Sequence, residues 1–120
     1  MGDASSPKVA AMPVTRHFQV RGKVQNVMFR QTVIRAMAKR SLEGGATNDK
    51  RDKKLVHVTL VGSPEIIDGL VGILAKGDPL NDWGATVTDI QEVPTGIAIH
   101  QVTTTNVDSK NWNPNCTMFI

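Results

Sequence analysis

Cysteine is nearly absent from this sequence: Cys116 is the only one in 120 residues. A single thiol can form neither an internal disulfide nor a thiolate metal cluster. The three histidines, His17, His57 and His100, show no spacing typical of metal ligands or of a base beside a nucleophile. The composition therefore indicates no metal site, and it favours a cytoplasmic protein.

Aromatic residues are also scarce, with no tyrosine, three phenylalanines and two tryptophans. A sheet that recognises RNA stacks bases on exposed aromatic rings, whereas Phe18 and Phe29 occupy positions that we predict to be buried. The formal net charge of +3 mildly favours anionic ligands but is too small to indicate nucleic acid binding. No apolar run approaches the length that spans a bilayer. We therefore expect neither a nucleic acid partner nor a membrane span.

The length of 120 residues predicts one domain. Residues 1–13 are rich in Ala, Ser and Pro and predict a disordered tail, so the domain is expected to cover residues 14–120. Gly2 and Ser6 match the pattern for N-myristoylation. Because so short a pattern recurs often by chance, we interpret it as a chance match.

The stretch that organises the chain is residues 22–30. It follows residues 14–20, where apolar and polar positions alternate as in a strand, and it leads into a helix predicted from residue 29 to residue 40. A strand, a tight loop and a helix start in this order aim main-chain N–H groups and the positive end of the helix at one point, which suits a phosphate group. Arg30, at the entrance to the helix, offers a planar fork of donors to the same anion.

The rest of the chain continues with strands and one more helix. That helix is expected to start at a Ser63 cap and Pro64, to carry the apolar stripe Ile66, Ile67, Leu70, Val71 and Leu74, and to stop at Gly77. The predicted strands are residues 46–48, 55–61 and 85–93, with residues 97–102 as a possible strand and residues 116–120 as an edge strand. Residues 49–54 are predicted to form a polar hairpin loop. We interpret its basic side chains as those of a solvated turn, with attraction of phosphorylated substrates as the alternative. The order βαββαβ with a further strand favours an α+β, ferredoxin-like sandwich, in which two helices cover one face of an antiparallel sheet.

The organising stretch resembles the phosphate loop of the acylphosphatase family, Gly-x-Val-Gln-Gly-Val-x-Phe-Arg, because it reads Gly22-x-Val24-Gln25-x-Val27-x-Phe29-Arg30. A second family string, Gly-x-x-x-Asn, is matched by Gly44 and Asn48. The resemblance extends from Arg16 to about Val93. The chain departs from the family at Asn26, where the family has Gly, and at Gly45, where it usually has Trp.

The resemblance implies hydrolysis of the carboxyl-phosphate bond of small-molecule acyl phosphates by in-line attack of water, without a metal, a cofactor or a covalent intermediate. It implies catalytic roles for Arg30, which stabilises the phosphoryl charge, and for Asn48, which orients the water. The protein is expected to act as a monomer. The residues implied in phosphate binding, mainly through their main-chain amides, are Gly22, Lys23, Val24, Gln25, Asn26, Val27 and Met28.

The departures at Asn26 and Gly45 leave a second interpretation open, in which the domain is a catalytically inactive regulatory module that binds acyl phosphate or phosphate. For the loop to turn tightly enough, we expect Asn26 to adopt a left-handed conformation, which Asn tolerates better than most residues. By the same resemblance, residues 116–120 are expected to form the final edge strand, after an extension over residues 95–115.

Overall fold

The computed structural model describes residues 12–110 and 113–120. The pattern at Gly2 and Ser6 therefore lies outside the described residues. The same holds for the expected tail, apart from residues 12 and 13. The elements in chain order are β2 (Val14–Lys23), α2 (Phe29–Lys39), β3 (Glu43–Asn48), β4 (Leu55–Gly62), α3 (Pro64–Ala75), β5 (Thr86–Val93), β6 (Val102–Thr103) and α4 (Val107–Lys110).

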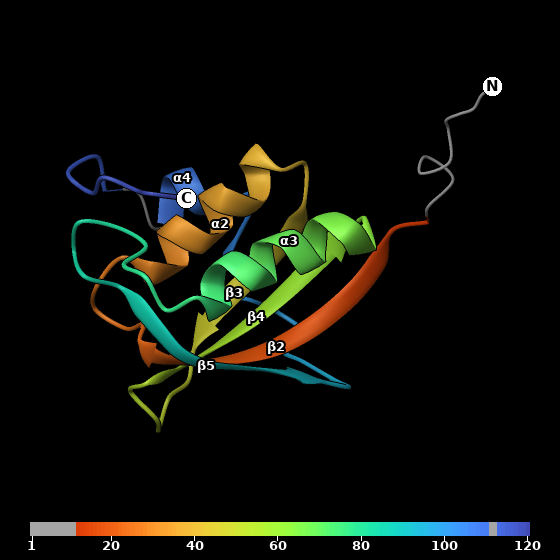
Figure 1. The fold of residues 1–120 in the computed structure, drawn as a ribbon, viewed down its shortest axis with the longest axis horizontal. Helices are drawn as coiled ribbons and strands as arrows, with labels where there is room; N and C mark the ends of the chain where they lie inside the picture. Colours follow the sequence, from red (N-terminus) through yellow and green to blue (C-terminus); the bar gives the residue numbers. More distant parts are fainter. Residues whose placement is uncertain (1–11, 111–112) are drawn as a thin grey trace.

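The strands form one five-stranded sheet in the order β5-β2-β4-β3-β6. Every pair of neighbouring strands is antiparallel, and α2 and α3 lie side by side on one face of the sheet (Figure 1). This arrangement confirms the predicted ferredoxin-like α+β fold. In the part of the chain that the structure describes, no helix is long and apolar enough to cross a membrane.

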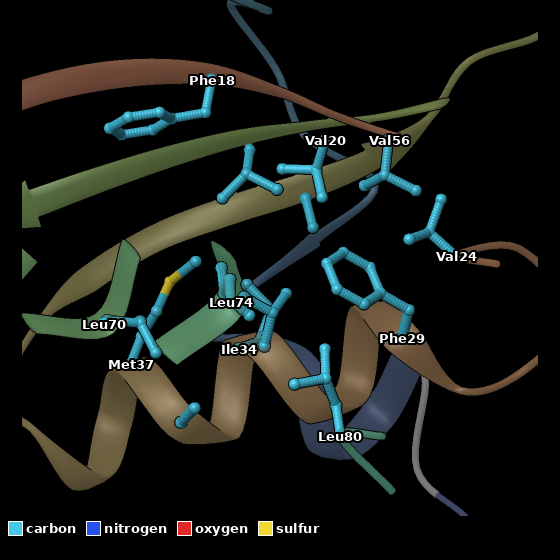
Figure 2. Packing of buried hydrophobic residues seen from close by; sticks show 14 of the residues in the cluster. Phe18, Val20, Val24, Phe29, Ile34, Met37, Val56, Leu70, Leu74 and Leu80 are labelled. Carbon is cyan, nitrogen blue, oxygen red and sulfur yellow. The ribbon is translucent and has the colours of Figure 1, made fainter. Parts of the chain in front are cut away.

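The core lies between the sheet and the two helices. Alternating strand residues such as Phe18, Val20 and Val56 point toward the helix layer, to which α2 contributes Ile34 and Met37 (Figure 2). Each of these side chains is at most 4% exposed, and burying one such side chain contributes roughly 1.5–3 kcal/mol. The periodic apolar positions of β2, β4 and α2 are therefore what holds the helices against the sheet.

Helix α3 follows the predicted pattern with two differences. Ser63 is its N-cap residue and Pro64 its first residue, but the Ser63 side chain makes no capping hydrogen bond. Ile67 in the predicted stripe is fully buried, whereas Ile66 is 40% exposed, so Ile66 was wrongly assigned to the buried face. Gly77 has a φ of 80° just beyond the helix, as expected for a left-handed stop.

Strand β3 begins earlier than predicted, at Glu43 rather than residue 46, so its two glycines lie inside the strand. Both permit close approach. A Cβ atom on Gly44 would lie 1.9 Å from the Thr59 carbonyl oxygen, and one on Gly45 would lie 2.5 Å from His100. The predicted strand starts only after the glycine pair. Glycine usually weakens a strand, but at these two positions close contacts from distant parts of the chain leave no room for a side chain.

Residues 94–101, which we call the crossing segment, do not form the strand proposed for residues 97–102. Only Val102 and Thr103 pair with β3. The crossing segment runs from β5 at one edge of the sheet to β6 at the other, over the face opposite the helices, where Gly96 lies against His17. It is held by side chains rather than by a ladder of main-chain hydrogen bonds. The alternation of apolar and polar residues over 97–102 therefore did not indicate a strand.

The prediction of an edge strand over residues 116–120 is also wrong, because β6 takes the position beside β3. The chain end instead pairs with the loop before β5, where Asn81 and Met118 form an isolated bridge. The Asp82 N–H donates to the Thr117 carbonyl at 2.9 Å. The short helix α4, which was not predicted, lies before this segment and packs its buried Val107 into the core.

Two glycine substitutions should have opposite effects on the free energy of unfolding. Gly72→Ala in α3 should raise it by up to about 1 kcal/mol, since alanine favours a helix and a Cβ atom there meets nothing within 4 Å. Gly44→Ala should lower it by more than about 2 kcal/mol, because of the clash with Thr59 and a φ of 153°. Urea denaturation measures both changes, and a Gly44 variant as stable as the wild type would contradict the close approach.

Candidate active site

The loop between β2 and α2, residues 24–28, has an unusual backbone. Asn26 has a φ of 64° and Met28 a φ of 59°. The left-handed conformation predicted for Asn26 is thus confirmed. The second left-handed residue, Met28, is the N-cap of α2 and was not anticipated. A left-handed conformation costs a non-glycine residue about 1–2 kcal/mol, so the surrounding structure must hold this loop in place.

Much of that support comes from Asn81, which is 1% exposed. Its Nδ2 donates to the Val27 carbonyl and to Thr32 Oγ1, both at 2.9 Å. Its Oδ1 accepts from the N–H groups of Trp83 and Ala85 at 2.9 and 3.2 Å. Thr32 in turn donates to the Met28 carbonyl at 2.8 Å. The carbonyl groups at the end of the loop are therefore fixed toward the protein interior.

The N–H groups of the same loop have no such partners. Of the hydrogen bonds within residues 12–110 and 113–120, none has a main-chain N–H of residues 24–28 as its donor. A small hollow of about 70 Å³ lies at this loop and is lined by Val24, Asn26, Met28, Phe29 and Arg30. Free N–H groups, a helix start and a guanidinium around one hollow form an arrangement suited to an anion.

The side chain of Gln25 joins this loop to the β3–β4 hairpin. Its Nε2 donates to the carbonyls of Asp49, Asp52 and Leu55 at 3.2, 3.1 and 2.9 Å. These contacts draw the hairpin and the end of β3 toward the loop. They also assign the Gln25 side chain to the hairpin, and Gln25 is not among the residues that line the 70 Å³ hollow.

Arg30 and Asn48, the two residues predicted to be catalytic, meet at a third residue. Gln101 Oε1 accepts from Arg30 Nη1 at 2.9 Å and from the Asn48 N–H at 2.8 Å. Arg30 is partly buried, which lowers the pKa of its guanidinium, and no carboxylate of the described residues pairs with it. The Oδ1 atom of Asn48 is buried and has no hydrogen-bond partner among the described residues. Gln101 Oε1 is therefore shared by the Arg30 guanidinium, which has no carboxylate partner among the described residues, and by the main-chain N–H of Asn48.

Comparison with known protein families matches residues 16–100 to the acylphosphatase family. The chain belongs to this family. The matched range agrees with the motif resemblance and adds seven residues beyond Val93. A comparison with curated protein sequences found no match.

Solved structures of acylphosphatases are similar to this chain. One, from Coxiella burnetii, is 26% identical, covers 75% of this chain and 86% of its own, and has a TM-score of 0.57. Another, from Bacillus subtilis, is 30% identical, covers 74% of this chain and 93% of its own, and has a TM-score of 0.54. Full-length HypF in its phosphate- and nucleotide-bound form shares the fold over 77% of this chain and 12% of its own, at 21% identity and a TM-score of 0.52.

The remaining motif residues of this acylphosphatase family member lie apart from the hollow. Gly22 is in β2, at a bulge after Arg21, and its N–H donates to the Lys54 carbonyl at 3.0 Å. Lys23 is exposed and lines a different, larger hollow together with Lys53 and Lys54. Both residues shape or flank the loop rather than line the 70 Å³ hollow.

The histidines form contacts that the sequence did not reveal. On the face of the sheet opposite the helices, Thr59 Oγ1 lies 3.0 Å from His17 Nδ1 and 2.7 Å from His100 Nε2. His100 Nδ1 lies 2.8 Å from Thr47 Oγ1, which also accepts the Gln101 N–H at 3.0 Å. Burial lowers the pKa of His100, and the nearby His17 and His57 add to this shift. This network fixes the crossing segment and so holds Gln101 between Arg30 and Asn48.

The departure at Gly45 agrees with this network. The His100 ring occupies the space beside Gly45 that a side chain would need. The usual tryptophan of the family would therefore collide with the crossing segment. Asn81 and Gln101 were both missed from the sequence, since each appears as an ordinary polar residue in a loop and acquires its role only through contacts with residues far away in the chain.

The substitution Asn81→Asp should lower the free energy of unfolding by about 2–4 kcal/mol at neutral pH. The introduced carboxylate could still accept hydrogen bonds from the N–H groups of Trp83 and Ala85. It would have no proton to donate to the Val27 carbonyl, which it would face at close range. Burial raises the pKa of the introduced carboxyl in the folded state, so the penalty should shrink as the pH falls through that pKa.

Urea denaturation at pH 7 and pH 5, with each variant compared with the wild type at the same pH, measures this effect. Asn26→Asp is the matched control, because the same chemical change at an exposed position of the loop should matter little. An equal loss in both variants, or a loss at Asn81 that does not depend on pH, would argue against the anchoring role.

Proposed function

We propose that this protein is an acylphosphatase, which hydrolyses acyl phosphates to a carboxylate and inorganic phosphate. The observation that carries the proposal is the group of unpartnered N–H donors at residues 24–28 next to the partly buried Arg30, which has no carboxylate partner among the described residues. A phosphoryl group brings the charge and the acceptor atoms that this arrangement needs. Family membership supports the same reaction.

In the proposed mechanism, the main-chain N–H groups of the loop and the Arg30 guanidinium bind the phosphoryl oxygens. A phosphoryl oxygen is charged and accepts hydrogen bonds more strongly than the neutral amide of Gln101, so substrate would replace Gln101 at one of the Arg30 donors. Arg30 and the loop then stabilise the charge that is redistributed in the transition state. The binding step is thus carried by fixed donors that need little rearrangement.

The Asn48 side chain orients the attacking water through its unpartnered amide. The water oxygen forms a bond to phosphorus, in line with the acyl oxygen, as the bond between phosphorus and that oxygen breaks. An amide is too weak a base to take the proton, so a phosphoryl oxygen of the substrate accepts it. The acyl group leaves as a carboxylate, and the mechanism uses no metal ion, cofactor or covalent intermediate.

The setting that we propose for this activity is a domain over residues 14–120 that works as a cytoplasmic monomer on small-molecule acyl phosphates.

One observation favours a second candidate function. Gln101 Oε1 already lies between Arg30 and Asn48, and a side chain that kept this position would leave a module that binds phosphate without turnover. Benzoyl phosphate hydrolysis, measured beside a binding titration with inorganic phosphate and without added metal, separates the two: binding alone would favour the module.

Arg30→Lys should reduce kcat/KM for benzoyl phosphate by about a hundredfold or more, the usual effect of losing one donor to a developing charge. A lysine ammonium cannot reproduce the planar fork of a guanidinium. Arg40→Lys, at the other end of α2, is the matched control and should keep most activity. If the Arg30 variant hydrolyses benzoyl phosphate at close to the wild-type rate, the assignment of Arg30 is wrong.

Asn48→Ala should lower kcat by about a hundredfold, while inhibition by inorganic phosphate stays within a factor of about two to three of the wild type. The variant keeps the main-chain N–H of residue 48 and loses only the side chain proposed to hold the water. Its stability should change little, because no hydrogen bond of the Asn48 side chain is found among the described residues. Loss of phosphate inhibition in parallel with kcat would make Asn48 a phosphate ligand instead.

A further inference from the structure

The crossing segment is attached to the sheet at few points. Among the described residues, no main-chain N–H or carbonyl group of residues 95–100 forms a hydrogen bond, and the first main-chain contact is the Gln101 N–H on Thr47 Oγ1. Ile99 is 86% exposed. A segment with few buried apolar contacts and few main-chain hydrogen bonds opens locally at a small cost in free energy. The attachment of the crossing segment therefore depends on a few side-chain contacts.

Two imidazole rings make most of those contacts. The His17 ring lies against Gly96 of the crossing segment. The His100 ring lies in turn against Gly45 of β3. Both rings also meet one hydroxyl group, because Thr59 Oγ1 lies 3.0 Å from His17 Nδ1 and 2.7 Å from His100 Nε2. The Thr59 hydroxyl is thus a junction between the sheet and the crossing segment.

This junction accommodates one positive charge but not two. A hydroxyl group has a single proton, so while one ring is neutral the Thr59 hydroxyl can donate to that ring and accept from the other. If His17 and His100 are both protonated, both present an N–H to the same oxygen atom, and two cations face each other across it. Their repulsion, together with the loss of an acceptor for the Thr59 proton, opposes that state.

No carboxylate at the junction offsets this repulsion. Within the described residues, neither His17 nor His100 forms an ion pair, and the crossing segment contains no ionisable side chain besides His100. Burial, followed by His17 on β2 and His57 on β4, lowers the pKa of His100. The other charged side chains on this side of the sheet are Arg21, Glu43, Asp49, Lys50, Arg51 and Asp89.

Attachment of the crossing segment therefore favours a neutral His100. As the pH falls below the ordinary pKa of a histidine, about 6.5, His100 takes up a proton readily when the segment is detached but resists it when the segment is attached. The attached state binds fewer protons and loses stability relative to the detached state. The loss grows until the pH reaches the lowered pKa of His100 and then levels off.

The same contacts fix the position of Gln101. Thr47 Oγ1 lies 2.8 Å from His100 Nδ1 and accepts the Gln101 N–H at 3.0 Å. Gln101 Oε1 in turn accepts from Arg30 Nη1 at 2.9 Å, which occupies a donor that an anion at residues 24–30 could use. When His100 leaves the sheet, Gln101 loses its support and Arg30 Nη1 becomes available to the anion.

We propose that the crossing segment is an inhibitory segment that acid releases: proton uptake at the junction of His17, Thr59 and His100 detaches it and withdraws Gln101 from Arg30. This inference rests on the proposed function, since the anion that gains access to Arg30 is the phosphoryl group of the substrate or the phosphate product. Around neutral pH, an anion must displace Gln101 to reach this donor. In mild acid it finds the donor free.

Sulfate is a suitable probe, because it is a tetrahedral dianion whose charge stays the same between pH 7.5 and pH 5. Its dissociation constant is measured by calorimetry over this range with the full-length protein at constant ionic strength. The wild type should bind sulfate about fivefold more tightly at the acid end, the effect of removing one competing hydrogen bond. The protection of the Gln101 N–H against hydrogen exchange, corrected for the intrinsic effect of pH, should fall over the same range.

The variant Gln101→Ala separates release of the segment from a simple gain of positive charge. It removes the inhibitory contact and keeps all three histidines. At pH 7.5 it should bind sulfate about fivefold more tightly than the wild type does. On acidification it should gain clearly less than the wild type, because nothing is left to withdraw from Arg30.

Two histidine variants test the junction. His17→Asn keeps a hydrogen-bonding atom near the position of Nδ1 but cannot become charged, so tighter sulfate binding and loss of Gln101 protection should both require a lower pH. His57→Gln is the matched control, since it removes a histidine of the same face that contacts Asp49 rather than Thr59. It should shift the pH dependence less. Unfolding temperatures of all variants check that the fold is kept.

Each other outcome overturns a defined statement. If the wild type hydrolyses benzoyl phosphate but Gln101→Ala gains as much from acid as the wild type does, or if the Gln101 N–H stays protected, the release is wrong while the proposed function stands. If the His17 and His57 variants shift the pH dependence equally, the junction at Thr59 is wrong. If the wild type binds sulfate at no pH, the proposed anion site fails, and its control by the crossing segment fails with it.

Discussion

The hydrogen bonds of one buried amide side chain support the geometry of the whole site. Asn81 fixes the Val27 carbonyl and Thr32, and it accepts two N–H groups of its own loop. These contacts offset the strain of two left-handed residues, Asn26 and Met28. With the carbonyls directed inward, the N–H groups of the loop are left without protein acceptors. The proposed anion site is therefore a consequence of how the loop is anchored, and the proposal needs no dedicated side chain beyond Arg30.

A second constraint brings the proposed catalytic pair, Arg30 and Asn48, together. Arg30 lies in the first turn of α2 and Asn48 ends β3, and neither element determines the position of the other's side chain. The crossing segment does so, because its Gln101 contacts both residues and its His100 is fixed to Thr59 and Thr47. The open face of the sheet, which is only a supporting surface in the simplest ferredoxin-like layout, here positions residues of the site.

The parts of the fold that the sequence predicted are those governed by local periodicity. Strands β2 and β4 and helices α2 and α3 alternate or repeat in ways that follow from which face is buried. The errors fall where distant contacts override the local signal. The glycines of β3 admit the Thr59 carbonyl and the His100 ring, and residues 116–120 alternate like a strand but pair with the loop at Asn81. Likewise, the motif singled out Arg30 and Asn48 as candidates, and the structure brings both to Gln101, whereas nothing near Asn81 or Gln101 in the chain indicates their partners.

The sequence separation of these anchoring contacts has a consequence for folding. The bond from Asn81 to Val27 spans 54 residues, and the bond from Arg30 to Gln101 spans 71. Closing such long segments carries an entropic cost that is recovered only when the sheet has assembled. During synthesis, the loop of residues 24–28 leaves the ribosome long before the residues that lock it. The nascent chain thus holds the loop of residues 24–28 in an unformed state until nearly all of the domain has emerged.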